Sequence, residues 1–250
     1  MFLAQVVPGF HGFNWPSWSV SGEAVAYLVF PLFGAWALRL SAQAALRTAV
    51  AVLLLGIVAM QVDGVVVGTW AQLDYTVMWT RIAVEFTAGV LLWVWWSRRG
   101  RVGVAGDAVA AGCVAATVVG LYLTGRDAPA VFVVLPFLAA FVVAVACARG
   151  PVARFLSSAP LQWRGRVSYS LYMVHFIVFL VAKKLVGWDR FAASSLPVRL
   201  AAAGAVALLI AAGACSAYYL VEEPGRRLVR AWTASRPAPR HRLSAGGSAA

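Results

Sequence analysis

Long apolar stretches separated by short polar segments dominate this chain. A membrane-spanning helix needs about 20 consecutive apolar residues, and the sequence contains several stretches of that length. The pattern predicts an all-α, polytopic transmembrane helix bundle of about seven helices. The predicted spans lie near residues 21–40, 46–67, 80–97, 107–124, 129–148, 168–187 and 198–221.

Two of these spans are interrupted. The second fades at Asp63 and Gly64, so a longer outer loop is predicted over 61–79, serving as a spacer, a lid or a re-entrant piece. The fifth contains Pro136, which a membrane helix tolerates when its neighbours satisfy the freed carbonyl. No internal repeat or heptad pattern stands out.

The basic residues alternate between the two sides of the predicted spans. Cytoplasmic loops of membrane proteins carry an excess of lysine and arginine. All but six of the 21 lysines and arginines fall in one set of loops and in the tail. This asymmetry predicts that the C-terminus is cytoplasmic and the N-terminus is outside. The six on the predicted outer side are Arg81, Arg126, Lys183, Lys184, Arg190 and Arg199.

The composition fits a membrane protein. Hydrophobic residues make up 62% of the chain, charged residues 12%, and the mean hydropathy is +0.81, whereas soluble domains are about half apolar and a quarter charged. The net charge is +12, and the basic residues lie in short loops. This distribution indicates a signal for membrane topology and not a binding surface for nucleic acid. We predict a multi-pass plasma-membrane protein in contact with lipid. Its predicted parts are an outer segment (1–20), one transmembrane domain (21–230) and a disordered basic cytoplasmic tail (231–250) near anionic headgroups.

Several kinds of chemistry lack a sequence signal. Cys113, Cys147 and Cys215 lie within apolar spans without metal-ligand spacing, so we predict small buried hydrophobes and no metal site. The sequence also has no Walker loop, dinucleotide-binding turn, HExxH motif or GxSxG elbow. Hydrolytic and nucleotide-driven reactions are therefore not supported.

Glu23 is the most informative polar residue, because it lies inside the first span. A carboxylate at membrane depth is costly unless it is paired, hydrated or used in chemistry. Trp18 and Ser19 precede it, and Tyr27 and Pro31 follow one and two turns later, which suggests a wet, interfacial entrance. We therefore predict a catalytic role for Glu23 and substrate-binding roles for Trp18, Ser19 and Tyr27. The alternative is a carboxylate that reaches back to water or caps its own helix.

Arg81 and Glu85 are four residues apart and share one face of the third span. One interpretation is an ion pair with no further role. The other is that Arg81 orients an anionic group or pairs with Glu23 in an outer cavity. We predict that both residues bind substrate.

Ser168, Tyr172 and His175 also share one helical face. Such a polar stripe should face the interior of the bundle, either as a structural hydrogen-bonded cluster or around a histidine that transfers a proton or binds a donor. We predict a catalytic role for His175 and substrate-binding roles for Ser168 and Tyr172. His11, in the outer segment, is a solvated loop histidine or a general base at the outer mouth.

The last span closes with Glu222, Glu223, Pro224 and a glycine, a sequence that ends helices. Glu222 and Pro224 are predicted to be structural. The two glutamates are expected to pair with basic loop residues such as Arg164 or Arg166.

Three ordered blocks resemble the acyltransferase 3 family of integral membrane O-acyltransferases. Trp18–Pro31 is similar to W-S-L-S-x-E followed by F-Y-L-x-x-P, Val167–Phe176 to S-Y-S-x-Y-L-x-H, and Tyr219–Pro224 to Y-x-x-E-x-P. A looser match comprises Arg81, Phe86 and Gly89. The chain departs from the pattern at Ala26, where the family has an aromatic residue, and at Gly22, where it has a bulkier one.

The resemblance implies O-acetylation in the cell envelope. The donor would be an acyl-CoA, typically acetyl-CoA, used as a co-substrate without any bound cofactor, and the acceptor a hydroxyl of an extracytoplasmic carbohydrate or glycolipid. Glu23 and Arg81 would line the acceptor side, and His175, Ser168 and Tyr172 the inner acyl path. The family opens with about three further helices, which carry its catalytic histidine, so we expect this chain to be an N-terminally incomplete member.

Two other interpretations stay open. The buried polar residues could line the path of a transporter or flippase for a lipid-linked sugar. Alternatively, the chain could be an inactive fragment, or a subunit whose partner supplies the absent helices.

Overall fold

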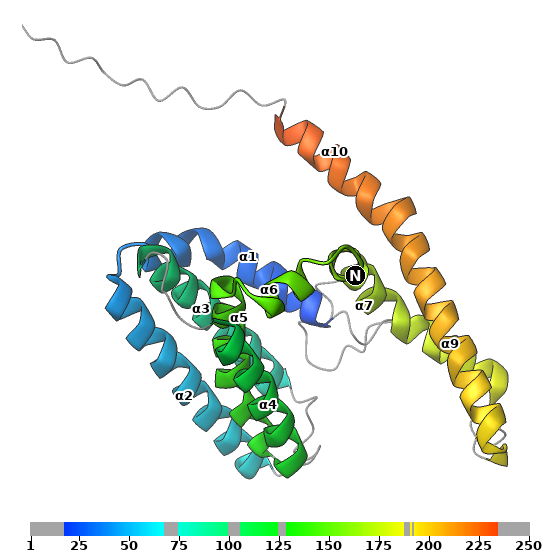
Figure 1. Cartoon of the computed structure of the whole chain (residues 1–250). Coiled ribbons are helices and arrows are strands. Elements are labelled where there is room, and N and C mark those ends of the chain that lie inside the picture. The colour runs from blue at the N-terminus through cyan, green and yellow to red at the C-terminus, as the bar shows by residue number, and fades with distance from the viewer. Residues whose placement is uncertain are drawn as a thin grey trace, which may run out of the picture. The chain divides into compact units, whose positions relative to one another are not determined.

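The structure, a computed structural model, describes residues 18–67, 75–99, 106–124, 129–187, 191 and 193–234. Helices account for almost all of this part, which contains no strand (Figure 1). The predicted all-α class is confirmed. The helices are α1 (Trp18–Ala37), α2 (Ala42–Val67), α3 (Tyr75–Arg99), α4 (Gly106–Thr124), the 3₁₀-helix η3 (Pro129–Val134), α5 (Leu135–Cys147), α6 (Pro151–Leu156), α7 (Ala159–Val186), α9 (Leu196–Ala217), the π-helix η4 (Tyr218–Glu222) and α10 (Glu223–Ala234).

Each predicted span falls on a helix. Among the described residues, five helical stretches are long and apolar enough to cross a membrane, and they lie in α1, α2, α4, α7 and the continuous helix from α9 to α10. The remaining two spans correspond to α3, which carries four charged residues among its 25, and to α5, which has only 13 residues. The count of seven spans and the orientation of the termini stay predictions.

One local prediction is wrong. The predicted loop over 61–79 is largely helical, because α2 continues to Val67 and α3 begins at Tyr75. A drop in hydrophobicity at Asp63 therefore does not end this helix. Pro136, which the fifth predicted span contains, lies in the first turn of α5. Its missing N–H falls where a helix has unsatisfied donors anyway.

The chain divides into two compact units, Met1–Arg164 and Gly165–Ala250, and the transmembrane domain over 21–230 stays a prediction. The boundary falls within α7. An apolar helix in lipid has little hydrophobic reason to pack against another helix, because lipid tails are equally apolar. Apolar character alone therefore does not show how many packed units a membrane chain forms.

In the first unit, α2 and α3 pack along a stripe of small and branched residues. Ala45 and Ala49 of α2 are fully buried with Leu91 and Val94 of α3. At Gly56, an added Cβ would collide with the side chain of Val84. Small residues let membrane helices approach closely, so this stripe fixes α3 against α2.

Asp107, in the first turn of α4, fastens α4 to the segment that follows α5. Its Oδ2 accepts hydrogen bonds from the backbone N–H groups of Arg149 at 3.2 Å and Gly150 at 2.8 Å. Its Oδ1 accepts from the N–H of Val152 at 2.7 Å. The first residues of α6 thus receive their cap from a side chain more than 40 positions earlier.

In the second unit, α7 packs against the end of α9. Val167 of α7 is buried with Ala214 and Tyr218. Helix α9 continues through η4 into α10 without a break (Figure 1). Residues 231–234, predicted to belong to the disordered tail, instead form the last turn of α10. The rest of that tail and the outer segment up to residue 17, including His11, lie outside the described residues.

Candidate functional site

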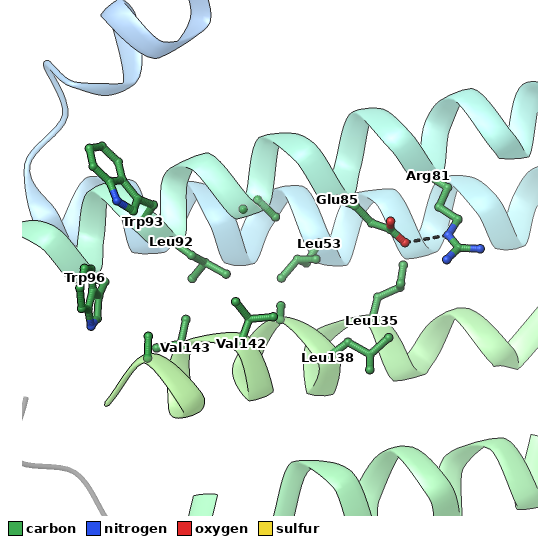
Figure 2. A pocket seen from close by; sticks show the side chains of 14 residues that line it. Leu53, Arg81, Glu85, Leu92, Trp93, Trp96, Leu135, Leu138, Val142 and Val143 are labelled. Atoms are coloured by element: carbon green, nitrogen blue, oxygen red, sulfur yellow. Dashed lines mark hydrogen bonds and ion pairs between the residues drawn. The ribbon is translucent and has the colours of Figure 1, made fainter. Parts of the chain in front are cut away.

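A groove of about 410 Å³ runs between α3 and α5 in the first unit (Figure 2). Apart from one ion pair, its lining consists of apolar and aromatic residues and one glycine. Helix α2 contributes one lining residue. Residues lining the groove include Leu53 of α2, Arg81, Glu85, Leu92, Trp93 and Trp96 of α3, and Leu135, Leu138, Val142 and Val143 of α5.

The ion pair lies at one end of this groove. Arg81 Nε donates a hydrogen bond to Glu85 Oε1 at 2.7 Å, and both side chains are roughly half exposed, at 47% and 42%. The predicted i,i+4 pairing is confirmed. Neither the two Nη groups of Arg81 nor Oε2 of Glu85 engages another described residue, so the pair retains donors and one acceptor for a ligand.

Two tryptophans mark the opposite end, as Figure 2 shows. Trp93 and Trp96 are three residues apart and therefore neighbours on α3. We did not predict them as site residues. Their position on the helix face that also carries Glu85 was the one sequence signal for a site. It is weak, because a tryptophan in a membrane helix more often anchors the helix at the membrane interface.

Helix α1 carries the predicted acceptor-side residues. Gly22 packs against Ile82 of α3, whose side chain occupies the space that a Cβ on Gly22 would need. A larger residue at this position, as in the family pattern, would require the Ile82 side chain to move. Further along, the rings of Phe30 and Phe86 meet edge to face at 6.0 Å.

Glu23 directly follows Gly22 in α1, and its side chain is exposed. Tyr27, one turn later, is 66% exposed. Glu23 forms no hydrogen bond or ion pair with another described residue, and it does not line the α3–α5 groove. A shared cavity with Arg81 therefore stays a prediction. Ser19 is half buried, the side chain of Trp18 lies outside the described part, and Pro31 falls inside α1.

In the second unit, Tyr172 and His175 lie together on α7, as their spacing predicts. Their ring centroids are 5.7 Å apart. His175 Nδ1 lies 2.7 Å from the backbone carbonyl oxygen of Tyr172. Because a carbonyl only accepts, Nδ1 carries the proton, and in the neutral ring Nε2 is the basic nitrogen. No other described residue binds Nε2.

Ser168 does not join this pair through its hydroxyl, which donates to the carbonyl of Gly165 at 2.8 Å in its own helix. Ser170, which we did not predict, is the buried hydroxyl, with 4% exposure. It donates to Glu222 Oε2 at 2.5 Å. A partner 52 positions away leaves no trace in local sequence spacing, so this contact was not predictable.

The closing motif pairs within its own helix. Glu222 Oε1 lies 2.6 Å from Arg226 Nη2, and Glu223 Oε1 lies 2.8 Å from Arg227 Nε. The expected pairing with Arg166 is therefore wrong, because i,i+4 partners lie side by side on a helix and meet first. Arg164 belongs to the first unit, so its pairing with these glutamates stays a prediction. Pro224 occupies the first turn of α10, and the preceding π-turn carries Glu222 toward Ser170.

A second groove, of about 270 Å³, lies between α7 and α9. Its lining includes Phe179, one turn beyond His175, and Lys183. The other lining residues are apolar or glycine. Among the described residues, no group of three or more His, Cys, Asp or Glu side chains is arranged to hold a metal ion.

Comparison with known proteins identifies a family. The acyltransferase 3 family model, described as an acyltransferase domain, matches residues 2–217. No curated protein and no solved structure matches the chain. The family match and the apolar helices together support a membrane acyltransferase.

Proposed function

The chain belongs to the acyltransferase 3 family, and from that premise we propose that it transfers an acyl group, expected to be acetyl, from an acyl-CoA to a hydroxyl. The proposed acceptor is a carbohydrate or glycolipid on the outer face of the plasma membrane. The extent of the family match, over residues 2–217, is the observation that carries this proposal.

In the proposed reaction, the acceptor oxygen attacks the thioester carbonyl of the donor. A carbon–oxygen bond forms, the carbon–sulfur bond breaks, and the hydroxyl proton ends on the released thiol. The reaction needs no oxidant and no metal. A group that takes up the proton speeds the attack, and donors near the carbonyl oxygen stabilise the charge that develops there.

We assign the proton-handling role within this chain to His175. The hydrogen bond from Nδ1 to the Tyr172 carbonyl supports this role, because it fixes the ring and directs the basic character to Nε2. Tyr172 lies beside the imidazole, where it would contact the donor. Ser168 is assigned to the same acyl path because it shares a face of α7 with Tyr172 and His175.

On the acceptor side, the Arg81–Glu85 pair offers both donors and an acceptor to a sugar hydroxyl. Glu23 is proposed to orient the acceptor as well. Its exposure on α1 is compatible with access by a ligand.

Membranes containing the protein, incubated with radiolabelled acetyl-CoA and envelope glycan, test this proposal. We expect labelled glycan with the wild type and at least a tenfold lower rate with His175→Gln or Glu23→Gln. Glu223→Gln is the matched control, because that glutamate pairs only with Arg227 in the described structure. Normal transfer by Glu23→Gln would remove Glu23 from the mechanism, and normal transfer by His175→Gln would do the same for His175.

The α3–α5 groove also suits a transporter or flippase for a lipid-linked sugar, since such a protein needs an apolar path with polar ends. The two functions differ in their need for a donor. Translocation of the lipid-linked sugar without any acyl-CoA, and without an ester product, would favour the transporter. Absence of both activities would indicate a fragment or subunit that needs a partner.

A further inference from the structure

We propose that the α3–α5 groove holds the hydrocarbon chain of a glycolipid and places the glycolipid's sugar at the Arg81–Glu85 pair. The proposal narrows the acceptor of the proposed function from carbohydrate in general to a lipid-linked saccharide. The role of this glycolipid as acceptor rests on the proposed function. Its binding to the groove does not, because binding is measurable without any acyl transfer.

The first observation is the division of the groove into an apolar channel and one polar end. Between Glu85 and Trp96, the walls present aliphatic side chains such as Leu92, Leu138 and Val142 (Figure 2). A water-soluble sugar or a nucleotide would find no hydrogen-bonding group along this stretch. A hydrocarbon chain needs none, and it can pack along these aliphatic walls by van der Waals contact.

The second observation concerns the polar end. The formal charges of Arg81 and Glu85 cancel within the pair, so this end does not select a bare anion. The pair instead presents guanidinium N–H donors beside a carboxylate oxygen that no other described residue engages. A hydroxyl both donates and accepts, and a sugar carries several hydroxyls, so this combination suits a saccharide head.

The third observation is length. Arg81 and Trp96 are 15 positions apart on one helix, which corresponds to about 22 Å at 1.5 Å per residue. One leaflet accounts for about 15 Å, half of the roughly 30 Å hydrocarbon core. A chain that fills the groove therefore extends beyond the depth of a single leaflet, which favours a long chain held nearly straight over a short one, and leaves the choice among long-chain lipids to the polar end.

The fourth observation is access. Val142 is 67% exposed and Trp93 54% exposed, so the groove is open along its side in the first unit. A chain can enter laterally from the bilayer and need not be threaded from one end.

A photoreactive hexadecyl glucoside, with a diazirine midway along its chain, serves as the probe. The full-length protein in nanodiscs is irradiated with the probe, and the labelled peptides are identified by mass spectrometry. Val142→Trp places an indole in the groove. Val118→Trp is the matched control, because Val118 on α4 is 60% exposed and lies outside the groove. Competitors are hexadecyl and octyl glucoside, palmitoyl-CoA and phosphatidylglycerol.

We expect label on α3 and α5, a loss of at least fivefold with Val142→Trp, and no change with Val118→Trp. Hexadecyl glucoside should compete at least tenfold better than octyl glucoside, palmitoyl-CoA or phosphatidylglycerol. Label spread evenly over exposed helices, or equal effects of the two tryptophans, would overturn the proposal. Better competition by phosphatidylglycerol would identify an ordinary lipid site, and better competition by palmitoyl-CoA a donor path.

The two proposals fail separately. Specific labelling without acyl transfer to any glycan would leave the groove assignment standing and count against the enzyme. Acyl transfer to soluble saccharide at full rate, with no specific labelling, would sustain the enzyme and overturn the glycolipid groove.

Discussion

Replacing Gly106 by alanine tests the packing that holds α4 against α5, the helix that forms one wall of the groove. A Cβ at this position would lie 2.8 Å from the carbonyl oxygen of Ala144 and 2.8 Å from the amide nitrogen of Ala148. Because both are backbone atoms, no change of rotamer can relieve the clash. Gly112, in the same helix, has no atom within 4 Å of the same added group, so it provides a matched control.

The two substitutions should change the free energy of unfolding in opposite directions. Overpacking typically costs about 1–3 kcal/mol, and clashes with backbone atoms place Gly106→Ala at about 2 kcal/mol of destabilisation or more. In a helix interior, alanine is favoured over glycine by about 0.5–1 kcal/mol, and nothing opposes that gain at Gly112. The free energies of unfolding of the two variants should therefore differ by about 3 kcal/mol.

Equilibrium unfolding in mixed micelles, driven by increasing sodium dodecyl sulfate and followed by helical circular dichroism, measures this difference. The midpoint should fall for Gly106→Ala and rise slightly for Gly112→Ala. Equal shifts for the two variants, or a stabilised Gly106→Ala protein, would refute the close approach of α4 and α5.

Three further predictions use the same titration. Asp107→Ala should unfold earlier than Asp107→Asn, because alanine leaves all three backbone N–H donors without their acceptor, and identical midpoints would argue against the fastening role. Ser170→Ala should cost about 1–2 kcal/mol by removing a buried hydrogen bond to a carboxylate, whereas Ser168→Ala, whose bond stays within its own helix, should change stability by less than about 0.5 kcal/mol. Gly56→Ala should cost about 1–3 kcal/mol, because the β-branched Val84 cannot turn away, and an unchanged midpoint would contradict that contact.

Apolar stretches located the helices well, because a membrane span must be both long and helical. Their ends were less predictable. Helix α2 has 26 residues and continues past Asp63. A helix satisfies its own backbone hydrogen bonds, so it can extend beyond the apolar core of the membrane. The packing stripe of Ala45, Ala49 and Gly56 was hidden for a related reason. A helix that is apolar on every face shows no contrast between its packed side and its lipid side.

Site residues within one helix were predictable from their spacing, as for Arg81 with Glu85 and Tyr172 with His175. Contacts between distant segments were not. Ser170 meets the carboxylate of Glu222, which lies 52 positions later in a π-turn, and no local pattern encodes this contact.

The most direct test of the central claim, that this is a membrane acyltransferase, is the mass of the acceptor after reaction. Membranes with and without the protein would receive isotopically labelled acetyl-CoA, and the extracted glycolipids and glycans would be analysed by mass spectrometry before and after mild alkali. We predict a protein-dependent mass increase of one labelled acetyl group that alkali removes, as expected for an ester. Equal acetylation in both membranes, with no alkali-labile label that depends on the protein, would contradict the account.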